Sequence, residues 1–211
     1  MKRIFFSMLL FITGLNAFAQ YGRTYSRFQD DHDLYYGLRL GLALASVNSD
    51  DDKLDGGSMQ SGLHLGAVIG FQLSSSAPVY LESGLAYTEK GGKGTLEHKK
   101  FTYSLNYLEM PIVVKYRYEM SDEMSIQPFA GGYLAVGISG KMKDYGDRTV
   151  ESSFTDERFK RFDGGLKIGC GFEYQVIYGE LAYDFGLANI CHSDFESSHT
   201  GCLYLNIGVN F

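Results

Sequence analysis

The chain has 211 residues, with 19 Lys or Arg against 25 Asp or Glu, a formal net charge of −6, and 45% hydrophobic residues. This mixture excludes an intrinsically disordered chain, and beyond the N-terminus no apolar run of about 18 residues exists to form a membrane helix. An acidic chain without a block of Lys or Arg also argues against nucleic acid as a partner.

The first residues have the features of a secretory signal peptide. Two basic residues precede an apolar run over residues 4–15, and a small-x-small cleavage site ends at Ala19, directly before Gln20. We expect cleavage after Ala19, which removes residues 1–19 and leaves residues 20–34 as a flexible polar leader. A membrane anchor is the alternative, but the apolar run is shorter than the ~20 residues that a spanning helix needs.

From about residue 36 onward, apolar residues recur with a period of two, which is typical of β-strands. Eight such runs follow in chain order, at residues 38–44, 63–73, 79–87, 103–118, 126–138, 162–174, 179–187 and 203–211. Connections of about 12 to 20 residues alternate with connections of about 3 to 8 residues. We therefore predict an all-β domain over residues 35–211, an eight-stranded antiparallel up-and-down barrel with long loops at one end.

The run over residues 103–118 changes parity. Tyr103, Leu105 and Tyr107 continue the apolar face in odd positions, whereas the later apolar residues stand in even positions. One extra residue reverses the two faces of a strand, and Pro111 cannot donate a ladder hydrogen bond. The pattern therefore predicts a β-bulge within residues 108–111.

The two faces of these strands differ in a way that separates a membrane barrel from a soluble sandwich, the alternative with the same alternation. The apolar face carries no charged residue, whereas glycines such as Gly41 and Gly169 interleave with charges on the polar face. A water-facing sheet gains nothing from glycine, but the narrow interior of an eight-stranded barrel needs small neighbours for its charges. The polar face is therefore predicted to line the lumen, and the apolar face to contact lipid.

The predicted lumen contains charges of both signs, four basic and six acidic. They are Arg39, Glu82, Glu109, Lys115, Arg117, Asp163, Lys167, Glu173, Glu180 and Asp184. Unpaired charges in a narrow interior are costly, so we expect a salt-bridged plug that fixes the strand register. A conduction pathway is the alternative, although eight strands leave little open bore.

Tyrosines gather toward the predicted strand ends. Their side chains, with an apolar ring and a polar hydroxyl group, suit the two interfacial girdles of a membrane barrel. These residues are Tyr36, Tyr87, Tyr103, Tyr107, Tyr116, Tyr118, Tyr174 and Tyr183.

Three segments carry a resemblance to a known family: Leu-Asn-Tyr-Leu-Glu-Met-Pro at residues 105–111, Phe-Asp-Gly-Gly-Leu-Lys-Ile-Gly at 162–169, and Tyr-Gly-Glu-Leu-Ala-Tyr at 178–183. Over about residues 35–211 the chain resembles the PorT-like small outer-membrane β-barrel proteins of Bacteroidetes. The resemblance implies the outer membrane of a Gram-negative bacterium and no catalytic signature. The last strand, ending at Phe211, is similar to the signal that the barrel assembly machinery recognises. A link to secretion belongs to few family members and is not carried onto residues here.

Two further groups of residues lie in the predicted loop near the C-terminus. The segment at residues 192–199 holds potential metal ligands together with Ser, His and Asp, yet consecutive loop residues rarely point at one centre, so a solvated loop is favoured over metal binding or catalysis. Cys191 and Cys202 flank this loop and are candidates for a disulfide bond, with Cys170 left over on the lipid face.

These features together predict a non-enzymatic barrel without cofactor, metal or catalytic residues. Outer-membrane lipid surrounds it, and its long outer loops, above all residues 139–160, are the expected contact for a protein partner, in an interaction, secretion-accessory or envelope-structural role. The alternative is a lipid-modifying enzyme that uses His192 and Ser193. A narrow transporter of small solutes is the third interpretation.

Overall fold

The computed structural model describes residues 34–49, 59–96, 99–144, 150–154, 159–191 and 197–211. The predicted cleavage site at Ala19 and Gln20, and all of the predicted leader except residue 34, lie outside these ranges. Among the residues that the structure describes, no helix is long and apolar enough to cross a membrane.

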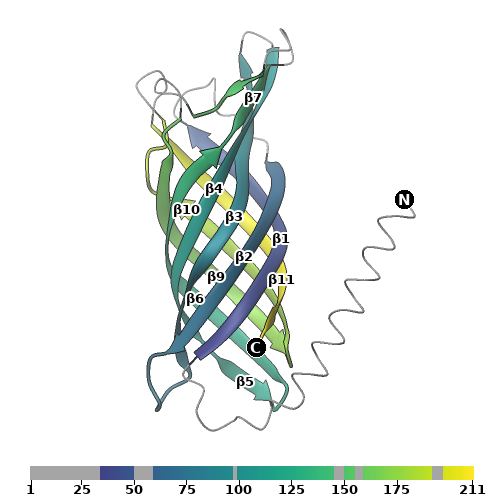
Figure 1. Ribbon diagram of the computed structural model, residues 1–211, viewed down its shortest axis with the longest axis vertical. Helices are drawn as coiled ribbons and strands as arrows, with labels where there is room; N and C mark the ends of the chain where they lie inside the picture. The colour runs from purple at the N-terminus through teal and green to yellow at the C-terminus, as the bar shows by residue number, and fades with distance from the viewer. Residues whose placement is uncertain (1–33, 50–58, 97–98, 145–149, 155–158, 192–196) are drawn as a thin grey trace, which may run out of the picture.

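Eight long strands form the wall of the molecule (Figure 1). They are β1 (Leu34–Ser49), β2 (Gln60–Gln72), β3 (Val79–Leu96), β4 (Lys99–Tyr116), β6 (Met124–Ser139), β9 (Phe162–Tyr174), β10 (Ile177–Gly186) and β11 (Ser198–Asn210). Three short strands extend the wall at its two ends, namely β5 (Tyr118–Ser121), β7 (Lys141–Asp144) and β8 (Val150–Ser152).

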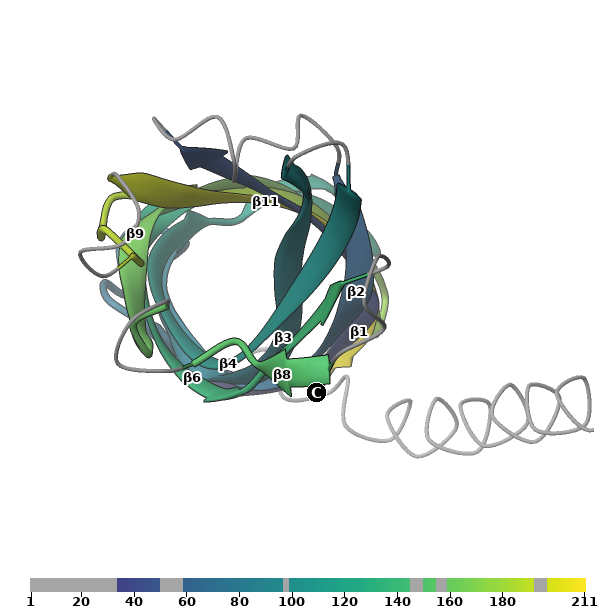
Figure 2. The same ribbon diagram turned by 90° about the horizontal axis from the view of Figure 1, so that it is seen from above.

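The wall closes on itself, and the eight-stranded antiparallel barrel predicted from the sequence is confirmed. Each long strand pairs antiparallel with the next one along the chain, β4 pairs with β6 and β6 with β9, and β1 pairs with β11 to complete the ring. Figure 2 shows the resulting closed ring seen along the barrel. Closure leaves no free strand edge in the barrel wall, as a membrane-spanning sheet requires.

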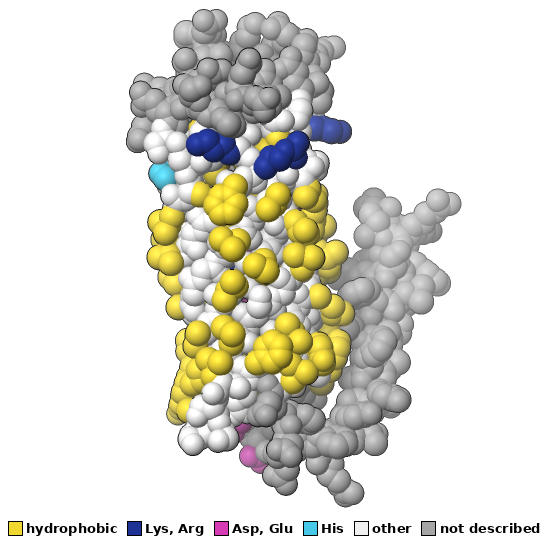
Figure 3. Space-filling model, turned by 60° about the vertical axis from the view of Figure 1, so that its left-hand side comes forward, with side chains coloured by type: hydrophobic (Ala, Val, Ile, Leu, Met, Phe, Trp, Pro, Cys, Tyr) yellow, Lys and Arg dark blue, Asp and Glu magenta, His cyan; other side chains and the backbone are white. Residues whose placement is uncertain are grey.

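Alternation along each strand gives the barrel an apolar outside and a polar inside. On β1 the leucines at 38, 40 and 42 are exposed, while Gly37, Arg39 and Ala43, at the alternate positions, are buried. Outward residues lie opposite one another across strands, as Leu42 does with Leu63 and with Leu205. The result is an apolar band around the middle of the barrel (Figure 3), which suits contact with hydrocarbon.

Tyrosines border this band at the end where the turns are short. Tyr36, Tyr116, Tyr118 and Tyr174 are exposed there, with fractions between 43% and 58%. Tyr103 and Tyr107, predicted for a girdle, are instead buried inside the barrel.

The connections differ between the two ends, as the sequence indicates. At one end, residues 73–78, 122–123 and 175–176 join strands by short turns, and Gln175 adopts a left-handed backbone there with φ of 55°. At the other end, β3 and β4 continue to Leu96 and Lys99, so the loop expected around Lys93 is mostly strand. The β3–β4 hairpin and β7 extend beyond the other strands at this end (Figure 1).

The predicted change of parity on β4 is wrong. Odd residues point inward from Tyr103 through Leu105, Tyr107 and Glu109 to Lys115, and the pairing of β3 with β4 keeps one register on both sides of Pro111. The irregularity lies instead between Asn106 and Tyr107 in the pairing with β6. The apolar residues at 103, 105 and 107 misled the prediction because the lumen itself is apolar at this level.

Candidate functional site: the charged lumen

The inward side chains place the predicted charge set inside the barrel. Eight of the ten charged residues are buried, and Arg117 and Glu180 are half-buried. The eight are Arg39, Glu82, Glu109, Lys115, Asp163, Lys167, Glu173 and Asp184. Because these residues lie at inward positions of five strands, β1, β3, β4, β9 and β10, the charges meet across the lumen in clusters.

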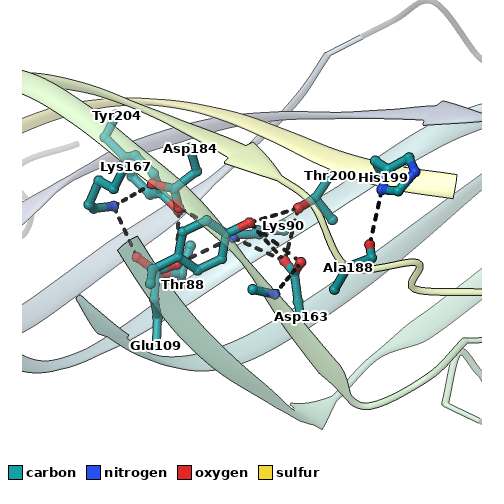
Figure 4. Close-up of polar contacts among 12 residues, drawn as sticks. Thr88, Lys90, Glu109, Asp163, Lys167, Asp184, Ala188, His199, Thr200 and Tyr204 are labelled. Carbon is teal, nitrogen blue, oxygen red and sulfur yellow. Dashed lines mark hydrogen bonds and ion pairs between the residues drawn. The ribbon is translucent and has the colours of Figure 1, made fainter. Parts of the chain in front are cut away.

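The largest cluster surrounds Lys90, a fully buried residue of β3 (Figure 4). The Lys90 ammonium lies 3.3 Å from a carboxylate oxygen of Glu109, 3.3 Å from one of Asp163 and 3.4 Å from one of Asp184. Lys167 approaches two of the same carboxylates, at 3.0 Å from Glu109 and 2.7 Å from Asp184. These five residues, named here the upper cluster, connect β3, β4, β9 and β10 across the interior.

Hydroxyl groups complete the upper cluster, in which two ammonium groups face three carboxylates. The Tyr204 hydroxyl lies 2.8 Å from Asp184 and 3.1 Å from Glu109. Thr200 donates to Asp163 at 2.9 Å, and the Tyr133 hydroxyl lies 3.4 Å from the same carboxylate. Thr200 and Tyr133 thus supply hydrogen bonds to Asp163, which has a single ion pair among the described residues, as a carboxylate in a dry interior requires.

A second cluster lies nearer the short turns and centres on Glu82. This carboxylate accepts from Lys115 at 2.8 Å, from the Tyr35 hydroxyl at 2.6 Å and from Arg39 at 3.5 Å. The Arg39 guanidinium also stacks 3.8 Å from the centre of the Tyr178 ring. Closer still to the turns, Glu173 accepts from Arg117 and Asn210. Glu180 accepts from Asn206 and lines the space between the two clusters.

Little space remains between the two clusters. A cavity of about 30 Å³ separates them, lined by Arg39, His64, Glu82, Glu109, Lys167 and Glu180 among others. That volume accommodates on the order of one or two water molecules. His64 at its wall contacts the Thr88 hydroxyl at 2.9 Å, so it packs as a hydrogen-bonded partner.

Glycines make the tight packing possible. A Cβ atom added to Gly171 would overlap the Tyr178 ring, and one added to Gly70 would overlap the Tyr35 ring. Both aromatic rings occupy the space in which a side chain would stand, which is why glycines accompany charges on the polar face.

An apolar cap closes the lumen above the upper cluster, on the side of the long connections. Phe154 and Phe159, from the segment between β8 and β9, are buried there together with Tyr103, Leu105 and Tyr107 of β4. Phe159 stacks on Tyr103 with ring centres 5.1 Å apart, and Phe154 meets Tyr107 edge-on at 5.8 Å. Part of the segment expected to be an exposed loop, residues 139–160, therefore folds into the mouth of the barrel.

Lys90 is the functional residue that the sequence prediction missed. The apolar alternation predicts the third strand only to Tyr87 and places Lys90 in the following loop, whereas β3 continues to Leu96. The signal was present, because Glu82, Ala86 and Thr88 continue to Lys90 at even, inward positions.

The disulfide considered for Cys191 and Cys202 is not formed in the structure, which describes both residues. Cys202 is a buried free thiol on β11, opposite Asp184. The amide of Ile190, the residue before Cys191, donates to the Ser198 carbonyl. Ser198 precedes Cys202 by four residues on β11. Four extended residues span ~13 Å, beyond the Cα separation of about 7 Å that a disulfide tolerates.

The segment at residues 192–199 is only partly described, because His192, Ser193 and the residues to 196 lie outside the described ranges. Ser197 contacts His199 at 3.3 Å, and the other ring nitrogen of His199 lies 3.2 Å from the Ala188 carbonyl. Within the described part of the chain, no group of three or more His, Cys, Asp or Glu residues is arranged to hold a metal ion.

A closed barrel with an apolar exterior and an ion-paired interior defines the class of integral membrane β-barrel proteins. Residues 18–192 match the family described as "Outer membrane protein beta-barrel domain". The chain belongs to this family and is an integral protein of the outer membrane of Gram-negative bacteria. No curated protein is similar enough to the sequence to be matched.

Three solved structures are similar to the chain at low sequence identity. Neisserial surface protein A is similar with a TM-score of 0.50 and 12% identity, over 83% of this chain and 97% of that one. The attachment invasion locus protein Ail of Yersinia pestis has a TM-score of 0.43 and 15% identity, over 84% and 98%. The outer membrane protein OprG of Pseudomonas aeruginosa has a TM-score of 0.42 and 13% identity, over 84% and 95%.

Proposed function

We propose that the protein is a closed, non-conducting and non-enzymatic barrel that anchors its long loops at the cell surface, where they contact a protein partner. The observation that carries this proposal is the filled lumen. Two ion-paired clusters occupy it, a cavity of about 30 Å³ remains between them, and the apolar cap covers the upper one. A rigid wall of this kind supports specificity in loops rather than passage through the centre.

The orientation follows from the two kinds of connection. In barrels of this class the short turns face the periplasm and the longer loops face outward. We infer the same arrangement here, with Phe211 beside the short turns, where the barrel assembly machinery would meet the last strand. A PorT-like membership, with its secretion-accessory role, is a finer proposal that rests on the resemblance of residues 105–111, 162–169 and 178–183.

Conductance tests the closed lumen. The refolded barrel, inserted into a planar lipid bilayer in concentrated KCl, is expected to give no discrete current steps at moderate voltage. Insertion is verified in the same preparation by electrophoretic mobility with and without boiling. Reproducible single-channel steps from the inserted protein would contradict the proposal and favour the solute transporter.

The loop contact is tested by crosslinking in intact cells. The cap fixes the choice of variant, because removing all of residues 139–160 would also remove Phe154 and Phe159 from the barrel mouth. Replacing residues 145–149 with Gly and Ser spares both rings, and a matched replacement of residues 50–54 serves as the control. Loss of a defined crosslinked protein in the 145–149 variant but not in the control locates the contact at residues 145–149, and capture that survives both replacements would contradict a loop contact at these sites.

The lipid-modifying alternative depends on His192 and Ser193. We expect the lipid profile of the outer membrane to stay the same when both are replaced by Ala. A specific change in acyl chains or headgroups would overturn the non-enzymatic proposal.

A further inference from the structure

The cavity between the two clusters carries charges of both signs on its wall. Two cations and three carboxylates line it, on Arg39, Lys167, Glu82, Glu109 and Glu180. The rest of the wall is mainly apolar and comes from β2, β3, β4 and β6. A wall of this kind can bind a small polar ligand if hydrogen-bonding groups on it remain unused.

Glu180 has unused hydrogen-bonding capacity at this wall. It stands at an inward position of β10, and one of its carboxylate oxygens accepts from the Asn206 amide at 2.8 Å. Within the described ranges the other oxygen has no donor and the carboxylate has no ion pair, whereas Glu82 and Glu109 are each paired with two cations. A carboxylate enclosed by protein needs donors that offset its lost hydration. Glu180 therefore requires a further donor within the cavity.

The two cations of the wall have unused donors. Arg39 is 2% exposed, and its Nε–H group has no acceptor in the part of the chain that the structure describes. The Lys167 ammonium donates to Glu109 at 3.0 Å and to Asp184 at 2.7 Å, and an ammonium group has a further N–H to donate. Neither cation is within ion-pair distance of Glu180. Donors and an acceptor thus lie around one cavity without bonding to each other.

The size and the charges of the cavity select the ligand. Its volume of about 30 Å³ has room for about one or two water molecules and excludes larger organic molecules. A bound anion would meet three carboxylates on the wall, and a bound cation would meet Arg39 and Lys167, in an interior that screens charge poorly. Water is neutral and both donates and accepts hydrogen bonds, so it can serve the unused donors and the unused acceptor together.

We propose that the cavity is a binding site for ordered water, which accepts from Arg39 or Lys167 and donates to Glu180. The water joins the cluster around Glu82 to the upper cluster, because Arg39 belongs to the first and Lys167 to the second. The charged lumen is then one hydrogen-bonded network below the apolar cap rather than two separate clusters. The water site depends on neither the orientation of the barrel nor a partner at its loops, so it goes beyond the proposed function.

A substitution that fills the cavity tests the proposal. Val113→Ile adds one methylene group at the cavity wall, where Val113 is 2% exposed. If water is bound there, the added group displaces it and leaves Glu180 without its donor, so the folding equilibrium constant from urea unfolding in lipid vesicles should fall about tenfold. A dry cavity predicts the opposite sign, a rise of roughly fourfold from the buried methylene. The matched control is Val114→Ile at the next residue, which is outward and 46% exposed, and it should change the constant by less than about twofold.

Further measurements separate bound water from crowding and from a bound ion. In a Glu180→Met background, which removes the acceptor, Val113→Ile should change the folding constant by less than about twofold, whereas crowding would lower the constant in both backgrounds. Oxygen-17 relaxation dispersion of the solvent, recorded on the whole barrel in detergent, should count about one more long-lived water in the parent than in Val113→Ile. Exchange of NaCl for choline gluconate at equal ionic strength should alter neither the count nor the stability.

Several results would overturn the water site. They are an equal water count in the parent and in Val113→Ile, a folding constant that rises or stays the same when the cavity is filled, an equal loss in both backgrounds, and a dependence on the identity of the salt. If Val113→Ile fails the mobility test for folding, Ala86→Val, which lines the same cavity, takes its place.

Discussion

Lys90 offers the sharpest test of how the lumen stabilises the barrel. Its ammonium contacts three carboxylates within 3.4 Å, and its side chain is completely buried. The Lys90→Met variant preserves the length and removes the charge. It leaves Lys167 with Glu109 and Asp184, and it leaves Asp163 without an ion pair among the described residues. Removing one partner of a buried ion pair typically costs about 3–5 kcal/mol, because the remaining charge is left uncompensated. We expect a loss of that size in the free energy of unfolding.

The measurement is urea unfolding of the barrel in lipid vesicles, followed by the mobility difference between folded and unfolded protein on gels. Lys93→Met is the matched control, since Lys93 lies on the same strand and is exposed; its effect should be within about 0.5 kcal/mol. Asp163 forms its ion pair with Lys90 alone among the described residues, so Lys90→Met/Asp163→Asn should restore the balance of charge. We expect the double variant to lose about 1–3 kcal/mol less of the free energy of unfolding than the two single variants lose together. A Lys90→Met loss below about 1 kcal/mol, or strict additivity, would refute the ion-paired plug.

Two other substitutions, one of them with a matched control, test the packing and the hydrogen bonds of the lumen by the same unfolding assay. Gly131→Ala places a Cβ against the Ile112 carbonyl and should lower the free energy of unfolding by about 1–3 kcal/mol. The control is Gly179→Ala, whose added Cβ has its nearest atom 3.9 Å away and should be tolerated; equal effects would contradict a crowded interior. Tyr204→Phe removes the hydroxyl between Glu109 and Asp184 and should lower the free energy of unfolding by about 1.5–3 kcal/mol. An unchanged stability would show that those carboxylates do not depend on the hydroxyl.

The period of two and the alternating lengths of the connections were sufficient to predict the eight strands and their closed antiparallel order. They worked because lipid outside and charge inside impose opposite chemistry on successive residues, as at Leu38 and Arg39. The same rule failed on β4, where Tyr103, Leu105 and Tyr107 are apolar yet inward. Their burial depends on Phe154 and Phe159, which arrive from a distant segment. A local pattern contains no information about that contact.

The candidate site was predictable to the extent that it follows strand parity. The ten charged residues could be assigned to one face from alternation, but their division into two clusters depends on register between strands, which the sequence leaves open. Lys90 was missed because β3 and β4 extend beyond the point where the apolar alternation fades. The separation of Cys191 and Cys202 likewise reflects a loop path that no spacing rule specifies.

Tryptophan fluorescence tests the central claim, that the leucine-rich face contacts lipid and the charged face is internal. The chain contains no Trp, so a single substitution introduces a unique reporter. Leu40→Trp and Ile168→Trp, each in folded barrels reconstituted into vesicles, should be quenched strongly by lipids brominated in their acyl chains and weakly by acrylamide in the water. Glu119→Trp, at the rim, should behave in the opposite way. Quenching of the first two reporters by acrylamide and not by brominated lipid would contradict the assignment of inside and outside.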